Sequence, residues 1–288
     1  MRALKSIYKN ECQIKEISIL KAFIIMAIYL VVYMLTTYVS TFIVSSGMTL
    51  INEDISFGPV MIVVGIITTV SSIIVVSIAG RMSIKKDAEE IISNKISITK
   101  KEFLYVFLII VGFILIREVF LLDILSQFEG PISENDIDFI LNNLSTIEIG
   151  IVGLVFFIQT VIIAPILEEF LFRRVILNGL LSKYKNNYKK AIIISALIFG
   201  IAHLNIPQGI NAFILGIILG GIYYYTGYMK LSIFAHFINN FLFLPTPETF
   251  LFKWIYAVLG IYLLIKGVKY LKYNKINSLR DNDYNINS

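Results

Sequence analysis

The side chains most capable of chemistry in this chain are Glu168, Glu169 and Arg173, which lie within six residues of one another. They interrupt an apolar stretch long enough to cross a membrane. A single charge at the centre of a bilayer costs roughly 2.5 to 3.5 kcal/mol on insertion scales. The run therefore predicts either a buried ion network or a wet cavity in which these groups act chemically.

Helical spacing separates the two carboxylates. Residues four apart share one face of an α-helix, so Glu169 and Arg173 can form an ion pair. Glu168 is turned by about 100° from its neighbour, which leaves its carboxylate available for proton transfer or for binding a metal ion. An ion network that only locks helix packing is the structural alternative.

The two histidines of the chain, His203 and His236, also lie in apolar stretches. Phe199 precedes His203 by four residues, so its ring can pack against the imidazole. Asn240 follows His236 by four residues, so two polar groups project from one helix face. Polar groups in hydrocarbon need partners, and a cavity shared with Glu168 would supply them.

A carboxylate and an imidazole beside one water can remove its proton and return it to a leaving amine, which is the general acid–base chemistry of peptide hydrolysis. His236 and Asn240 could then donate hydrogen bonds to the oxyanion. Alternatively, Glu168, His203 and His236 form a His₂Glu set sufficient for catalytic Zn²⁺. The spacing leaves metal-bound and metal-free water equally open.

The composition indicates an integral membrane protein. Of 288 residues, 57% are apolar and only 16% are charged, against roughly 25% charged residues in an average soluble domain. We predict an all-α fold, a polytopic membrane bundle of about eight transmembrane helices around an intramembrane active-site cavity. The predicted spans are Ala22 to Val44, Pro59 to Gly80, Phe103 to Leu125, Ile149 to Leu181, Ala191 to Leu204, Gly209 to Thr226, Leu231 to Leu244 and Leu251 to Leu271.

Two spans are irregular. The fourth is too long for one straight crossing and contains Pro165, whereas the fifth is too short and is followed by Pro207, so we expect tilted or broken helices at both. Upright helices would separate His203 and His236 in depth by on the order of 10 Å. A single site therefore requires tilt, or a fifth span that begins near Lys190.

Charge asymmetry predicts the orientation, because cytoplasmic loops are rich in Lys and Arg. Bases precede the first span and follow the second, fourth, sixth and eighth, so we expect both termini in the cytoplasm. This topology accounts for the net charge of +5, and no nucleic-acid partner is predicted. The first span is too long for a signal peptide and lacks an A-x-A site. Nineteen Lys against six Arg, with abundant Ile and Asn, indicate an AT-rich bacterial genome, and hence a bacterial plasma membrane.

The order of the motifs resembles a known family. Glu168-Glu169-x-x-x-Arg173, Phe199-x-x-x-His203 and His236-x-x-x-Asn240 are similar to the three motifs of the CAAX protease and bacteriocin-processing (CPBP, or Abi) family of intramembrane peptidases. The three motifs occur in the family's order within about 75 residues. The family includes the type II CAAX prenyl endopeptidases and is commonly labelled metalloprotease, although a metal-free glutamate mechanism has also been proposed for it.

The resemblance implies a role for each motif residue. Glu168 resembles the catalytic glutamate and His203 the histidine that helps it activate water, whereas His236 and Asn240 resemble the oxyanion-stabilising pair. Glu169, Arg173 and Phe199 would support the site. The implied cofactor is either none or Zn²⁺ held by Glu168, His203 and His236, and the implied partner is a peptide or membrane-associated protein substrate.

We expect three regions, with transmembrane helices one to three in 1–146, the catalytic core in 147–245, and the final transmembrane helix with a polar tail in 246–288. An intramembrane endopeptidase is the leading hypothesis. The alternatives are a non-catalytic bacteriocin self-immunity or scaffold protein, and a transporter whose buried charges bind an ion or substrate. The absence of an inverted repeat counts against a transporter.

Overall fold

The computed structural model describes residues 13–51, 57–85, 98–128 and 145–286, and the predicted all-α fold is confirmed. Some of the charged residues used to predict the orientation lie outside these ranges. They are Arg2, Lys5, Lys9, Glu53, Asp54, Lys86, Lys95, Glu129, Glu134, Asp136 and Asp138. The helices are α2 (Ile19–Ile51), α3 (Phe57–Ser83), α4 (Lys100–Ile116), α5 (Leu122–Leu125), α7 (Thr146–Phe157), α8 (Ala164–Glu168), α9 (Asn178–Lys183), α10 (Tyr188–Ile201), α11 (Ile206–Thr226), α12 (Met229–Phe241) and α13 (Phe250–Ile286).

Each of the eight predicted spans corresponds to helix. Six helical segments are long and apolar enough to cross a membrane within the described residues. The other two, α10 and α12, have 14 and 13 residues, which is shorter than the ~20 residues of a full crossing. The chain is therefore a multi-pass membrane protein. His203 lies in the turn that follows the short helix α10, and His236 lies in the short helix α12.

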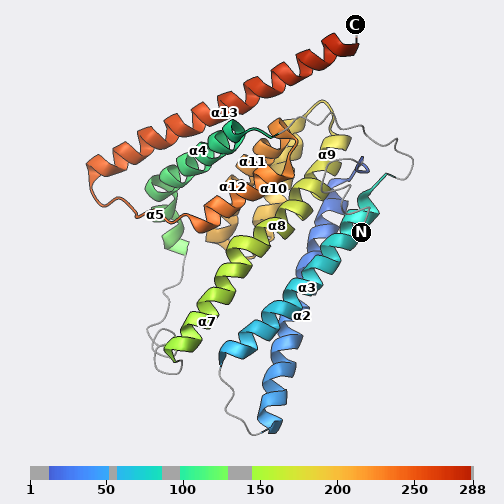
Figure 1. Ribbon diagram of the computed structural model, residues 1–288, viewed down its shortest axis with the longest axis vertical. Coiled ribbons are helices and arrows are strands. Elements are labelled where there is room, and N and C mark those ends of the chain that lie inside the picture. The colour runs from blue at the N-terminus through green and yellow to red at the C-terminus, as the bar shows by residue number, and fades with distance from the viewer. Residues whose placement is uncertain (1–12, 52–56, 86–97, 129–144, 287–288) are drawn as a thin grey trace.

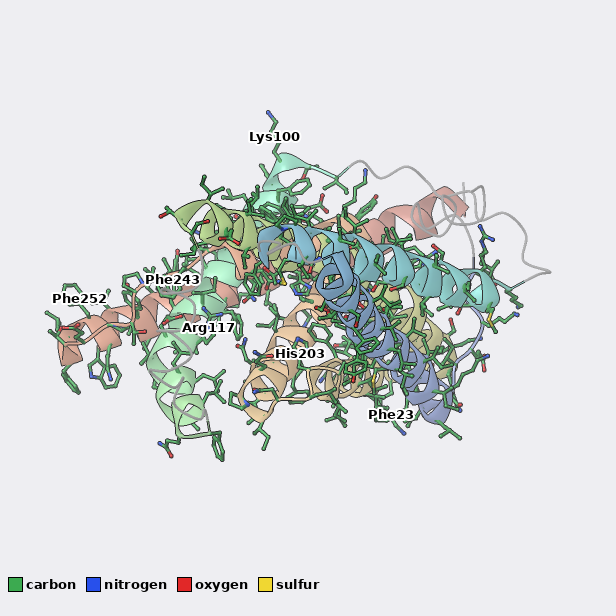
Figure 2. All side chains as sticks on the ribbon, turned by 90° about the horizontal axis from the view of Figure 1, so that it is seen from below. Phe23, Lys100, Arg117, His203, Phe243 and Phe252 are labelled. Atoms are coloured by element: carbon green, nitrogen blue, oxygen red, sulfur yellow. The ribbon has the colours of Figure 1, made fainter. Side chains whose placement is uncertain are left out.

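The apolar surface of the bundle faces outward. Large side chains such as Phe42, Ile66, Trp254 and Val258 are more than half exposed. In water such a surface would aggregate, whereas in a bilayer it is the natural contact with lipid. Figure 2 shows Phe23 and Phe252 at the outer edges of the molecule and His203 near its middle. Of the polar residues of the motifs, Glu169, Arg173 and His236 are buried inside the bundle.

The helices form three groups (Figure 1). α2 and α3 run side by side next to α7, α4 packs along α13, and α10 packs against α11. The segment from α7 to α9 runs through the centre, where it contacts α3 and α12 on either side of the motif. This long segment carries Glu168, α12 carries His236, and His203 lies in the turn after α10.

The long fourth span is one continuous helical run, Thr146–Lys183, rather than a broken one. Two π-helical segments, Ile158–Ile163 and Glu169–Leu177, flank α8. Pro165 lacks a backbone N–H and cannot complete the α-helical pattern, and a π segment directly before it absorbs this defect. The change of register, rather than a break, is how the helix tolerates Pro165.

Close helix packing at glycine gives a testable prediction. An ideal Cβ at Gly112 in α4 would lie 2.7 Å from the carbonyl oxygen of Gly260 in α13. Gly112→Ala must push the two helices apart, and overpacking of this kind costs about 1 to 3 kcal/mol. We expect a lower Tm in detergent. Gly221→Ala in α11, where a Cβ meets open space, should leave Tm unchanged. Equal Tm values for the two variants would contradict this packing.

Candidate active site

Glu169 is the centre of a buried ion network. Its Oε1 lies 3.1 Å from Nη1 of Arg173, as the four-residue spacing predicts, and both side chains are almost fully buried. The same oxygen accepts a hydrogen bond from Nδ1 of His236 at 3.0 Å. The Arg173 guanidinium also lies 4.5 Å from the centre of the Phe199 ring. Glu169 therefore joins the first and third motifs directly.

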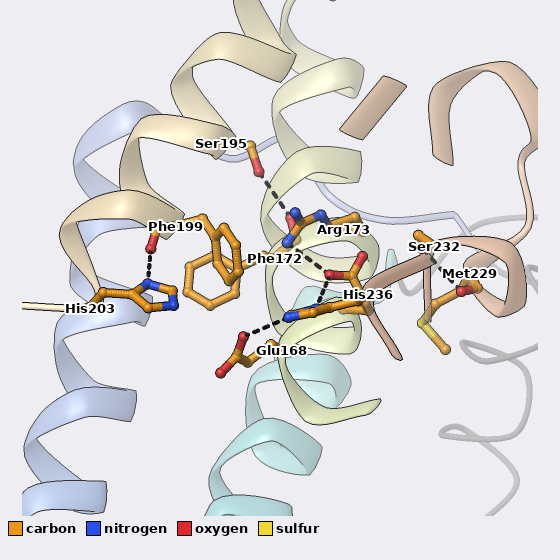
Figure 3. A network of polar contacts seen from close by, with 10 residues as sticks. Glu168, Phe172, Arg173, Ser195, Phe199, His203, Met229, Ser232 and His236 are labelled. Atoms are coloured by element: carbon orange, nitrogen blue, oxygen red, sulfur yellow. Dashed lines mark hydrogen bonds and ion pairs between the residues drawn. The ribbon is translucent and has the colours of Figure 1, made fainter. Parts of the chain in front are cut away.

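The two adjacent carboxylates have different environments. The Glu169 side chain is 0% exposed, whereas the Glu168 side chain is 22% exposed and lines a cavity. Oε2 of Glu168 lies 3.8 Å from Nε2 of His236 (Figure 3). Because the Glu169 carboxylate only accepts hydrogen bonds, Nδ1 of His236 carries a hydrogen and Nε2 faces Glu168. Of the two carboxylates, only that of Glu168 is open to the cavity.

A tight turn positions His203 just after α10. Leu204 has a φ of 53°, a left-handed conformation that is unusual for a residue with a Cβ, and Asn205 then caps the start of α11. The imidazole folds back so that Nδ1 donates to the Phe199 carbonyl oxygen at 2.9 Å. A carbonyl only accepts, so Nε2 of His203 remains an acceptor. This bond holds the ring in one orientation and does not involve Nε2.

One cavity brings the predicted residues together. Glu168, Phe199, His203, His236 and Asn240 all line a cavity of about 240 Å³. The Phe199 ring makes edge-to-face contacts with both imidazoles, at centroid distances of 5.0 Å to His203 and 5.8 Å to His236. His203 and His236 therefore lie at one cavity, without the separation that upright helices would impose. α10 begins at Tyr188, three residues before the predicted start of the span.

Asn240 lines the cavity but is already bonded. Its Nδ2 donates to the backbone carbonyl of Thr160 at 2.9 Å, and its Oδ1 accepts from Nδ2 of Asn239. Thr160 lies in the first π segment, and Phe172 in the second π segment likewise accepts a hydrogen bond from Ser195. A π-helical register leaves backbone carbonyls able to accept such bonds. The amide of Asn240 thus ties α12 to the π segment before Glu168.

The proposed zinc ligands do not converge on a common point. Within the described ranges, no three His, Cys, Asp or Glu residues gather closely enough to hold a metal ion. Nδ1 of each histidine is bonded to protein, and Nε2 of His236 faces the Glu168 carboxylate. Glu168, His203 and His236 share a cavity but, in this arrangement, do not fit the coordination of Zn²⁺.

Two further cavities adjoin the site. One of about 390 Å³ shares Glu168, Phe199 and His203 with the first and extends to Tyr29 and Ser72 of α2 and α3. Another, of about 420 Å³, continues from it between α2, α3 and α7 and is mainly apolar. Polar groups near Glu168 and apolar walls near α7 thus follow one another along neighbouring cavities.

Several residues of the cavity have no counterpart in the three motifs. Gln208, Asn211 and Asn239 line it together with Glu168. Their signal in the sequence is weak, since each is a single amide within an apolar stretch. The three-residue spacing of Gln208 and Asn211 predicts that they share one face of α11. It does not predict that this face points toward Glu168.

The comparison with known families agrees with this geometry. A family model described as type II CAAX prenyl endopeptidase Rce1-like matches residues 150–242, which include all three motifs. No curated protein and no solved structure is significantly similar to the chain. Residues 150–242 thus form an Rce1-like type II CAAX prenyl endopeptidase domain, which is consistent with the CPBP family and supports, at family level, a CAAX-type intramembrane endopeptidase.

Proposed function

We propose that this protein hydrolyses a peptide bond within the membrane by means of a water molecule activated by Glu168 and His203. The observation that carries the proposal is the shared cavity, in which one partly exposed carboxylate and two oriented imidazoles meet inside the Rce1-like domain. Buried polar groups of this kind are costly in hydrocarbon, and a catalytic role explains their retention.

Glu168 acts as the general base in this mechanism. It takes a proton from water while Nε2 of His203 accepts the other water hydrogen and holds the oxygen in place. The water oxygen bonds to the scissile carbonyl carbon, and the carbonyl becomes an oxyanion. His236 and Asn240 are proposed to stabilise that charge, which requires a hydrogen on Nε2 of His236 as well as on Nδ1, and requires Asn240 to exchange its bond to Thr160 for one to the oxyanion.

Collapse of the intermediate completes the reaction. Glu168 returns its proton to the amide nitrogen, the C–N bond breaks, and an amine and a carboxylic acid leave. Glu169 keeps His236 oriented through Nδ1, while Arg173 balances the buried Glu169 charge. Phe199 packs between the two imidazoles and carries the carbonyl that orients His203.

The remaining assignments rest on the motif positions and on the composition and charge asymmetry of the sequence. We propose residues 147–245 as the catalytic core, with the other helices surrounding it in a bacterial plasma membrane and both termini in the cytoplasm. The substrate class is a peptide or a membrane-associated protein.

Peptide profiling of membranes tests the proposal. Cells that produce the wild type should release peptides that are absent from cells producing Glu168→Gln at the same level. Identical profiles, with Glu168→Gln still conferring any associated phenotype, would instead indicate the non-catalytic immunity or scaffold role, in which the Glu169, Arg173 and His236 network serves packing alone.

Metal removal gives a separate prediction. Because the candidate ligands do not gather into a metal-binding cluster in the described structure, we expect a chelator to leave cleavage by the purified protein unchanged. The measurement is the initial rate before and after dialysis against 1,10-phenanthroline, with metal content determined in parallel. Loss of the rate, followed by recovery on adding Zn²⁺, would show that Glu168 and the histidines rearrange to hold a metal ion.

A further inference from the structure

Asn211 is a polar residue of the active-site cavity that the proposed mechanism does not use. It lies in α11, one turn beyond the helix start, and lines the cavity together with Glu168, His203 and His236. Its Oδ1 is buried and accepts no hydrogen bond from the described residues. A buried amide oxygen without a partner costs about 1 to 3 kcal/mol. An unpaired group of this kind in a membrane protein calls for a physical explanation.

The two neighbouring amides on α12 bond to the protein through their Nδ2 groups, although Oδ1 of Asn239 is also buried without a partner among the described residues. Nδ2 of Asn239 donates to Asn240, and Asn240 donates to Thr160 of the π segment. Those two residues connect α12 to the helix that carries Glu168, so a structural role accounts for them. Asn211 makes no such connection through its Oδ1, and helix packing therefore does not account for it.

We propose that Asn211 binds the main chain of the substrate beside the scissile bond. A side-chain amide and a peptide group each carry one donor and one acceptor that can pair with each other. The terminal torsion of Asn is soft, so the amide can turn either end toward the cavity. In a helical substrate the backbone groups are already bonded to one another. Asn211 would thus pair with an extended peptide segment, and this inference rests on the proposed peptidase function.

The experiment compares Asn211→Leu with the wild type, using full-length protein in detergent. The probe is a quenched-fluorescent peptide that spans a cleavage site found by comparing the wild type with Glu168→Gln. Loss of one neutral hydrogen bond should lower kcat/KM about fivefold to tenfold, mainly through a higher KM. Leucine removes the unpaired amide from the protein interior, so Tm should stay equal or rise. Asn178→Leu at the start of α9 is the matched control and should leave kcat/KM unchanged.

Two results would overturn the assignment. Wild-type kcat/KM in Asn211→Leu would show that no substrate group pairs with Asn211. A lower Tm would show that the amide serves folding. If Asn211→Leu does not accumulate, Asn211→Ser, which keeps a polar group of shorter reach, should accumulate and show an intermediate KM, and wild-type KM would refute the pairing. If the wild type shows no Glu168-dependent cleavage of any peptide, the proposed function itself fails, which is a result distinct from these.

Discussion

Glu168→Gln is expected to lower kcat by about 10² to 10⁴-fold, the usual contribution of a general base. Gln has nearly the same size and shape as Glu but cannot take a proton from water. The Glu168 side chain is partly exposed to the cavity and lies outside the buried Glu169–Arg173 pair, so its neutralisation should leave the fold intact. Cleavage kinetics and thermal unfolding on the same preparation separate the two effects.

The matched control for this substitution is Glu248→Gln in the exposed loop between α12 and α13. It removes the same charge from the same chain and should leave kcat and Tm at wild-type values. A Glu168→Gln protein that retains full kcat would exclude the glutamate mechanism. A variant that loses kcat and Tm together would assign Glu168 to folding.

Arg173→Met is expected to destabilise the protein by about 3 to 5 kcal/mol, because it leaves the Glu169 carboxylate in the interior without its cation. Arg173 and Glu169 are 1% and 0% exposed, so water cannot solvate the remaining charge. The substitution also removes the guanidinium from the face of the Phe199 ring, which orients both histidines. Thermal unfolding in detergent measures the loss.

A double substitution distinguishes an uncompensated charge from a packing defect. In Glu169→Gln/Arg173→Met neither member of the pair leaves an uncompensated charge, and replacing a buried ion pair by neutral groups is often neutral for stability. We expect Tm to return toward the wild-type value while kcat remains low, since an amide holds Nδ1 of His236 more weakly than a carboxylate does. Arg81→Met, at the exposed end of α3, is the control for loss of an arginine. A double variant as unstable as Arg173→Met would contradict the charge argument.

The helices and the Glu169–Arg173 pair could be predicted because they depend on local spacing. Apolar length predicted the position of each span, although α2 and α13 run 7 and 15 residues past the predicted ends, and a four-residue offset predicted an ion pair that the structure shows at 3.1 Å. Irregular helix was harder to predict. Pro165 suggested a tilted or broken fourth span, whereas a π segment keeps the helix continuous, because the outcome depends on neighbours that satisfy the freed carbonyls.

The sequence by itself determined that this is a membrane bundle with three short polar motifs, since composition, apolar length and residue offsets are all properties of the chain. The tertiary structure alone decided how the motifs meet. It placed His236 against both carboxylates, turned Asn240 to Thr160 eighty residues away, and left Asn211 beside Glu168 with an unpaired oxygen. These contacts depend on the depth, tilt and rotation of whole helices, which the sum of their packing interactions sets and which no local pattern encodes.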